Sequence, residues 1–249
     1  MKYAVISDIH GNMEALEAVL KDIETAEQAD KILCLGDLAM AGPEPAAAVD
    51  RVMELVKAGK VVCIQGNTDK MIADFNDDIL KNLQSKNEIM ANALQADVKA
   101  LNGEQKDFLK NLPVNYEFSY LNTKILMVHG SPRKNDENIF PEMPMSEIEE
   151  MVKDTDADII LCGHTHVPCG YQTESRKTIV NDGSVGRPFS EEPKACYAVL
   201  DIGMGCVSVR HKHIAYDVDT ASKKLLSRGF DGSDKLAKML IHATSRYPQ

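Results

Sequence analysis

The chain has 249 residues, of which 27% are charged and 44% hydrophobic, and its formal net charge is −10 at pH 7. These proportions are typical of a globular protein rather than a disordered one, and the negative charge argues against non-specific binding to a nucleic-acid backbone. Every apolar run is shorter than the ~18 residues of a membrane span, and no basic and apolar leader precedes the first strand, so we expect a cytoplasmic protein with no membrane partner.

Three apolar runs near the N-terminus are typical of buried β-strands, because each is short and stops at a polar residue or Gly. They cover residues 2–7, 31–35 and 60–65, and residues 13–28 and 44–58 between them carry apolar side chains at helical spacing. This alternation predicts an α/β fold with crossover helices. Cys34, Cys63 and Cys162 lie in apolar runs, so we expect small core residues with reduced thiols.

Residues 70–112 break this alternation, because they contain no strand-like run and place apolar side chains three or four residues apart. We predict two or three helices, with a break near Asn102-Gly103 and a stop at Pro113. The segment either covers a sheet edge or dimer face, which leaves a homo-oligomer open, or forms a cap over a substrate pocket. Its start directly after Gly66-Asn67 favours the cap.

The second half of the chain is expected to contain more strands. Residues 114–128 predict a strand pair around Leu121-Asn122, and residues 145–153 predict a helix with Ser146 as N-cap and Glu149 completing a capping box. Further elements are strands at 159–162, 178–181, 196–202 and 206–216 and helices at 217–228 and 232–246. We find no linker or repeat and therefore expect a single domain over residues 1–249.

Polar side chains follow five of the strand-like runs, where each run ends. They are Asp8, His10, Asp37, Asn67, His129, His164 and His166. Because ligands of open α/β sheets bind at the carboxyl ends of the strands, we expect these side chains to share one edge. This nitrogen and oxygen donor set without thiolate suits Mn, Fe, Zn, Ni or Co. Seven donors are too many for one tetrahedral ion and suit two divalent ions, with Asp37 as the bridging carboxylate.

The motifs Asp8-x-His10, Gly36-Asp37, Gly66-Asn67-x-Asp69, His129-Gly130 and Gly163-His164-x-His166 resemble the signature of calcineurin-like metallophosphoesterases. Two further segments, Asp8–Leu16 and Asp182–Pro188, resemble the small bacterial and archaeal phosphodiesterase-like branch. The resemblance implies a four-layer α/β fold, with two mixed β-sheets packed as a sandwich between helices and a helical cap at about 70–112.

The resemblance also implies the chemistry. Asp8, His10, Asp37 and His166 would hold one metal ion, and Asp37, Asn67, His129 and His164 the other. A metal-bridging hydroxide would attack the phosphorus of a small phosphorylated substrate, such as a nucleotide, in line, with Asp37, Asn67 and His129 as catalytic residues. The expected activity is that of a phosphodiesterase. The alternatives are a phosphomonoesterase acting on nucleotides or phosphoproteins, and a metal-bound scaffold without turnover.

Thr68 departs from the pattern of this family, in which many members have a His directly after the ligand Asn. A threonine hydroxyl cannot act as a general acid near neutral pH. Fast cleavage of alkyl monoesters is therefore not expected, and diesters with good leaving groups are favoured.

Five other residues have two interpretations each. Arg187 either pairs with a substrate phosphate or is a surface residue. Asp69 either braces the Asn67 loop or caps a helix, and Asn12 either braces the Asp8–His10 turn or, as we favour, is the N-cap of the first helix. His211 and His213 share one strand face, for which we favour solvent exposure over metal binding.

Overall fold

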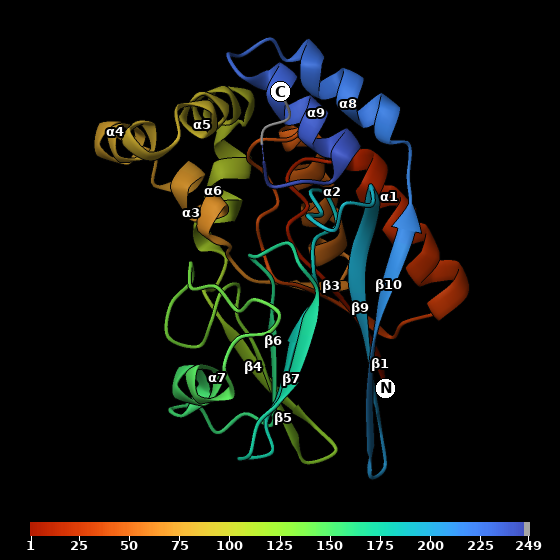
Figure 1. Cartoon of the computed structure of the whole chain (residues 1–249). Coiled ribbons are helices and arrows are strands. Elements are labelled where there is room, and N and C mark those ends of the chain that lie inside the picture. The colour runs from red at the N-terminus through yellow and green to blue at the C-terminus, as the bar shows by residue number, and fades with distance from the viewer. Residues whose placement is uncertain (247–249) are drawn as a thin grey trace.

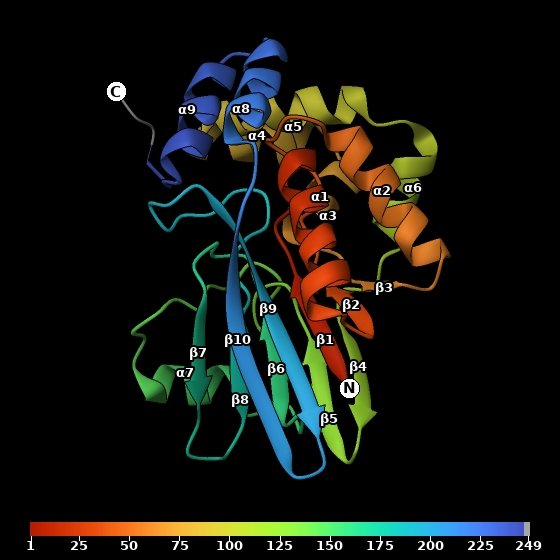
Figure 2. The same cartoon turned by 90° about the vertical axis from the view of Figure 1, so that its right-hand side faces the viewer.

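The computed structural model describes residues 1–246, which form two five-stranded mixed sheets (Figures 1 and 2). The first sheet has the order β10 (Cys206–Ala215), β9 (Lys194–Gly203), β1 (Lys2–Ile6), β2 (Lys31–Cys34) and β3 (Val61–Cys63). The second has the order β4 (Tyr116–Tyr120), β5 (Thr123–Met127), β6 (Ile159–Cys162), β8 (Thr178–Asn181) and β7 (Cys169–Gln172). Strands β1, β2 and β3 are parallel, as are β5, β6 and β8, while β9, β10, β4 and β7 pair antiparallel.

The two sheets pack face to face because successive side chains of a strand point to opposite faces. In β1, Tyr3 and Val5 belong to the core between the sheets, whereas Ala4 and Ile6 belong to the core under the helices. Strand β6 alternates in the same way, with Ile159 facing the first sheet. The expected sandwich of two sheets flanked by helices is confirmed.

Helices cover the outer face of each sheet. Helices α1 (Met13–Asp22), α2 (Pro45–Lys57), α8 (Val218–Ser227) and α9 (Ser233–His242) share one buried cluster on the first sheet, and α7 (Met145–Val152) packs on the second. Helix α1 continues into a π-helical turn, η1 (Ile23–Glu27), so the predicted helix over 13–28 is two elements. None of the helices in residues 1–246 has the length and hydropathy needed to cross a bilayer.

Residues 67–111 form more helices than predicted: α3 (Asn67–Ala73), α4 (Asp77–Lys86), α5 (Glu88–Ala100) and α6 (Gly103–Asn111). The break at Asn102 is confirmed, because its side chain caps α6 in a capping box with Gln105. The extra break was missed because Asn76 and Asn87, which cap α4 and α5, were not recognised as N-caps. Helices α5 and α6 contribute buried side chains to the core, whereas α4 projects outward (Figure 1).

Two smaller predictions were wrong, and one strand was not predicted. Helix α7 begins after Pro144 without a capping side chain among the described residues, and the Glu149 carboxylate accepts hydrogen bonds from Ser175 instead of completing a capping box. The last helix ends at His242, because Ala243 adopts a left-handed conformation with φ 44°. Strand β7 was not predicted, because it is a four-residue edge strand without an apolar run. Cys34, Cys63 and Cys162 are buried free thiols, as expected.

Candidate metal centre

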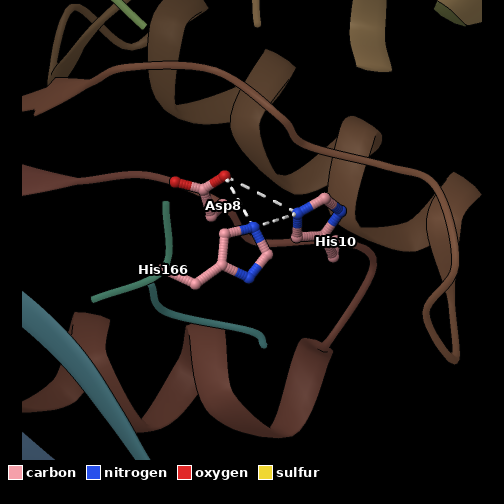
Figure 3. A group of neighbouring side chains, drawn as sticks. All are labelled: Asp8, His10 and His166. Atoms are coloured by element: carbon pink, nitrogen blue, oxygen red, sulfur yellow. Dashed lines mark hydrogen bonds and ion pairs between the residues drawn. The ribbon is translucent and has the colours of Figure 1, made fainter. Parts of the chain in front are cut away.

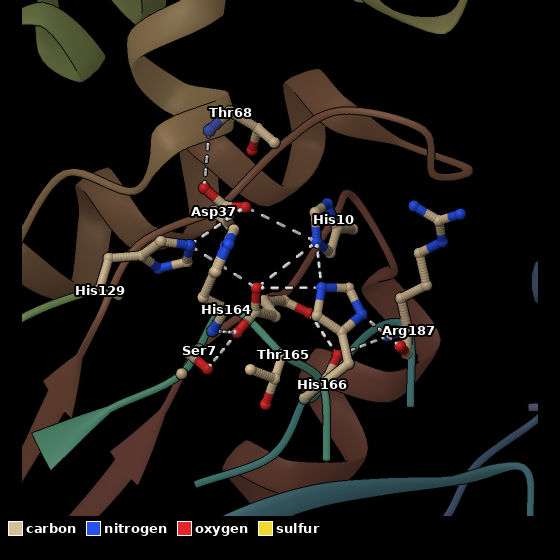
Figure 4. Close-up of polar contacts among 12 residues, drawn as sticks. Ser7, His10, Asp37, Thr68, His129, His164, Thr165, His166 and Arg187 are labelled. Carbon is tan, nitrogen blue, oxygen red and sulfur yellow. Dashed lines mark hydrogen bonds and ion pairs between the residues drawn. The ribbon is translucent and has the colours of Figure 1, made fainter. Parts of the chain in front are cut away.

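The carboxyl ends of the parallel strands of both sheets meet at one place. Asp8 follows β1, Asp37 follows β2, Asn67 begins α3 after β3, His129 follows β5, and His164 and His166 follow β6. Figure 4 shows side chains from these strand ends pointing toward one another. The structure thus brings together residues up to 158 positions apart in the chain, as the strand-end pattern predicted.

Two overlapping groups of donor atoms occupy this region, and both include Asp8. The first is Asp8, His10 and His166 (Figure 3), and the second is Asp8, Asp37 and His129. The Asp8 Oδ1 atom lies 3.2 Å from His166 Nε2, 3.6 Å from His10 Nε2 and 4.0 Å from His129 Nε2. All five residues are buried, with exposed fractions between 0% and 6%. A carboxylate and imidazole nitrogens at these distances are suited to hold divalent cations.

The second carboxylate lies between the histidines of the two groups. Asp37 Oδ2 is 3.4 Å from His129 Nε2 and 3.8 Å from His10 Nε2. Asn67 adds a neutral oxygen, because its Oδ1 lies 2.9 Å from His129 Nε2. The ring of His164 packs edge-on against that of His129, with their centroids 5.2 Å apart.

Backbone carbonyls orient three of the imidazole rings. The Nδ1 atom of His10 lies 2.9 Å from Met40 O, that of His129 lies 2.9 Å from Leu35 O, and that of His166 lies 2.6 Å from Arg187 O. A carbonyl oxygen can only accept a hydrogen bond, so Nδ1 carries the proton. In the neutral ring, Nε2 then presents its lone pair to the centre, as in histidines that bind metals.

Two observations show that this site fits a cation. His10 Nε2 and His166 Nε2 are only 3.1 Å apart, so the lone pairs of two neutral rings would face each other. Asp8 Oδ1 is buried and has no hydrogen-bond partner among residues 1–246. Buried polar atoms normally have partners, and a divalent ion would satisfy all three of these atoms together.

The pKa values of Asp37 and His129 show that the buried carboxylates and imidazoles stabilise each other's charged forms. Burial alone would raise the pKa of Asp37, but the neighbouring His129 and His10 outweigh it and lower this pKa to about 2. Burial works against the charged form of His129, yet Asp37 and Asp8 raise its pKa to about 10. Without a metal ion, a proton on His129 therefore neutralises part of the carboxylate charge.

The backbone at the candidate ligands is strained. The φ angles are 51° at Asp8, 46° at His10, 55° at Asp37, 68° at His164 and 61° at His166. Non-glycine residues seldom adopt this left-handed region, although Asp and His tolerate it better than most, and such strain is typical of functional sites.

Further buried side chains hold the carboxylates. Asp8 Oδ2 accepts hydrogen bonds from Ser7 Oγ at 2.5 Å and from the His164 backbone N–H at 2.9 Å. Ser7 Oγ also lies 2.8 Å from Asp182 Oδ1. Since burial and the nearby Asp8 raise the pKa of Asp182 well above its usual value, a protonated Asp182 can donate to Ser7, which then donates to Asp8. Sequence reasoning missed Ser7 and Asp182 as supporting residues, although Asp182 lies within a motif that carried the resemblance.

Asp69 braces the Asp37 turn. Its carboxylate accepts hydrogen bonds from the backbone N–H groups of Asp37 at 2.8 Å, Leu38 at 2.9 Å and Gly66 at 3.0 Å. The bond to Gly66 confirms that Asp69 braces the backbone next to Asn67. Asp69 is not the N-cap of α3, a position that Gly66 occupies, but at position N3 it completes the capping box of that helix. Asn12 is the N-cap of α1, as favoured, since its Oδ1 accepts from Ala15 N. Its Nδ2 donates to Gly186 O, and the Gly186 N–H in turn donates to Asp8 O.

Arg187 is 8% exposed, so its interpretation as a surface residue is wrong. Its guanidinium lies 5.6 Å from the centroid of the Phe189 ring and contacts the sulfur atoms of Met90 and Met239. Figure 4 shows Arg187 beside His10 and His166.

His213 is exposed, as expected, whereas His211 is half-buried and its Nε2 lies 2.8 Å from Asn181 O. Neither histidine belongs to a metal-ligating cluster within residues 1–246.

Comparisons with known proteins agree with this geometry. Residues 1–205 match the calcineurin-like phosphoesterase superfamily domain. An uncharacterized protein of Methanocaldococcus jannaschii is 29% identical over 239 residues, which cover 90% of this chain and 91% of that protein. The crystal structure of a hypothetical protein from Pyrococcus horikoshii has a TM-score of 0.86 at 24% identity, covering 97% of this chain and 98% of that one. A metallophosphoesterase from Sphaerobacter thermophilus has a TM-score of 0.76 at 25% identity, covering 98% and 100%. This chain belongs to the calcineurin-like phosphoesterase superfamily.

Proposed function

We propose that this protein hydrolyses a phosphate diester with the help of two divalent metal ions. The observation that carries the proposal is the pair of buried donor groups that overlap at Asp8, because overlapping groups can hold two neighbouring ions. Mn, Fe, Zn, Ni and Co all suit this mixed nitrogen and oxygen donor set.

Asp8 is common to both donor groups, but its Oδ2 atom already accepts hydrogen bonds from Ser7 and the His164 N–H, so we assign the shared position to Asp37. Asp8, His10, Asp37 and His166 would hold one ion, and Asp37, Asn67, His129 and His164 would hold the other. The position of Asp37 Oδ2, 3.4 Å from His129 Nε2 and 3.8 Å from His10 Nε2, supports its role as the shared carboxylate.

Two bound ions would lower the pKa of a water molecule and neutralise charge on the phosphate. The contribution of the chain is to fix positions and charges, which is most of what phosphoryl transfer requires. Asp37 remains ionised at neutral pH because its pKa is about 2, and His129 is oriented by its bond to Leu35 O. Asn67 ligates through a neutral oxygen and so adds no negative charge where the anionic phosphate must bind.

Thr68 supports a substrate with a good leaving group. Its hydroxyl donates to Ala39 O at 3.0 Å and its backbone N–H donates to Asp37 Oδ1 at 2.9 Å, so both groups serve the Asp37 turn. A leaving oxygen would receive no proton from this position. Diesters whose leaving group departs as a weak base are therefore favoured over alkyl monoesters.

Arg187 is proposed to bind the phosphate. Arg187 is buried, and its guanidinium lies beside His10 and His166 in Figure 4. A phosphate oxygen would form a charge-assisted hydrogen bond, which is roughly twice as strong as a neutral one.

The test is the hydrolysis of bis(p-nitrophenyl) phosphate and p-nitrophenyl phosphate by the Mn²⁺-loaded protein. We expect metal-dependent cleavage of the diester in preference to the monoester, loss of that cleavage in Asp37→Asn, and increased monoester cleavage in Thr68→His. Preference for the monoester would favour a phosphomonoesterase. Bound metal without turnover of any ester would favour a scaffold.

A further inference from the structure

A groove of about 460 Å³ opens beside the metal centre, between α3, α4 and the loop of residues 134–136. Asn67 lines this α3–α4 groove, and the Oδ1 atom of the same residue lies 2.9 Å from His129 Nε2. Asp136 on the loop wall lies close enough to His164 for the two side chains to affect each other's pKa. A molecule whose phosphate is held at the centre can therefore extend directly into the groove, whose volume suits a small-molecule ligand.

One side of the groove is apolar. Met71 of α3 and Ile79 and Leu83 of α4 line it, and all three are only half-buried. Helix α4 is amphipathic, yet in the described structure it has no fully buried residue. An apolar helix face without full cover, beside a phosphoesterase centre, suits the apolar part of a substrate.

The rim of the groove is basic. Three lysines, Lys70, Lys86 and Lys134, line it together with only two carboxylates, although the whole chain has a formal net charge of −10. Lys70 is paired with Asp74 at 2.6 Å and Lys134 with Asp136 at 2.9 Å. Such exposed pairs are weak and can exchange for a ligand anion, whereas Lys86 has no ion-pair partner within residues 1–246.

We propose that the α3–α4 groove binds the rest of a nucleotide substrate, with the base against Met71, Ile79 and Leu83 and a second phosphate near the lysines. A nucleotide with more than one phosphate combines a flat base, whose faces are apolar, with a further anionic group, and its size suits a groove of this volume. This proposal rests on the proposed function and specifies its substrate class.

Helix α4 offers matched control positions for the test. Leu83 and Lys86 line the groove, whereas Leu80 and Lys81 lie on the same helix and do not. The probes are thymidine 5′-(p-nitrophenyl phosphate) and methyl p-nitrophenyl phosphate, which share a leaving group and differ in the nucleoside. The binding probes are ADP and inorganic phosphate.

We expect the wild-type protein to prefer the thymidine ester in kcat/KM, and Leu83→Asn to reduce this preference about tenfold while Leu80→Asn keeps it. Lys86→Ala should weaken ADP binding about fivefold relative to inorganic phosphate, and Lys81→Ala should not. The proposal would be overturned if the wild-type protein cleaved the two esters with equal kcat/KM. It would also be overturned if Leu83→Asn kept the ester preference of Leu80→Asn and Lys86→Ala bound ADP as tightly as Lys81→Ala.

Failure of the proposed function would give a different result. If the metal-loaded protein cleaved neither ester, calorimetric titration of ADP into the same variants would still test the groove. Weaker binding by Lys86→Ala than by Lys81→Ala would support a nucleotide site without hydrolysis, and equal binding would refute it.

Discussion

Replacing Gly163 with Ala should disturb the metal centre without removing any proposed ligand. A Cβ atom at this position would overlap with Ser7 Oγ and would lie 2.7 Å from Asp8 Oδ2. Ordinary contacts of a Cβ atom are 3.4–4 Å, so Ser7 and Asp8 would have to move by the better part of an ångström. The φ angle of Gly163 is outside the left-handed region, so the perturbation is steric rather than conformational.

The size of the effect follows from what Asp8 touches. Its Oδ2 accepts hydrogen bonds from Ser7 Oγ and His164 N, and its Oδ1 lies 3.2 Å from His166 Nε2. Overpacking of this kind lowers the free energy of unfolding by about 1–3 kcal/mol. Displacing the partners that orient a ligand lowers metal affinity about 10–100-fold.

Titration of Mn²⁺ into the metal-free protein would measure this affinity, and thermal unfolding in EDTA would measure the stability of the fold separately. Gly170→Ala is the matched control, because its Cβ would meet no atom closer than Ile179 O at 3.7 Å. The reasoning would be refuted if Gly163→Ala bound Mn²⁺ as tightly as Gly170→Ala and unfolded at the same temperature.

Three further predictions concern buried charges. Asp37→Asn should lower diester hydrolysis at least about 10³-fold while the circular dichroism spectrum stays that of the wild type, and near wild-type turnover would refute its role as shared ligand. In the metal-free protein the pKa of His129 is raised to about 10, which contributes at most about 5 kcal/mol to the free energy of unfolding. This contribution is present in full below pH 6.5 and is lost as the pH rises toward 10. The unfolding temperature measured in EDTA should therefore decrease as the pH is raised from 6.5 to 9, and it should decrease less when Mn²⁺ is present. An equal decrease under both conditions would contradict this prediction. Asp97, which is fully buried, accepts hydrogen bonds from Met40 N at 2.7 Å and Arg228 Nη1 at 2.5 Å. Asp97→Ala should thus lower the free energy of unfolding by about 3–5 kcal/mol in urea titrations, and a loss below 1 kcal/mol would show that Arg228 finds other partners.

The strand ends could be predicted from the sequence because the rule behind them is local. A short apolar run that stops at Asp, Asn, His or Gly indicates where a buried strand reaches the surface. Parallel strands then bring those ends to one edge, so Asp8, Asp37 and His129 could be grouped before any distance was known. Residues 67–111 were harder, because short helices with Asn caps look much like longer helices with polar faces.

The supporting residues could not be predicted, because their roles depend on contacts between distant parts of the chain. Ser7 and Asp182 are 175 residues apart, and Asp97 lies 57 residues from Met40. A serine before an aspartate, or an aspartate within a helix, has no local pattern that reveals a buried partner. Arg187 was ambiguous for the same reason, since its burial depends on Met90 and Met239 from two separate helices.

The backbone explains how the strained ligand positions are maintained. The turns after β1 and β2 continue the pairing of the two strands through bonds from Asp8 N to Gly36 O, His10 N to Asp37 O and Gly11 N to Leu38 O, at 2.9–3.0 Å. The left-handed residues of one turn are therefore bonded to the other turn, and neither can relax alone. These bonds are made by the chain itself, so the carboxylates and imidazoles are already in place before a cation binds. A cation bound there would relieve the repulsion between groups that the fold has brought together, such as the facing Nε2 atoms of His10 and His166, and its binding free energy would add to the stability of an existing fold.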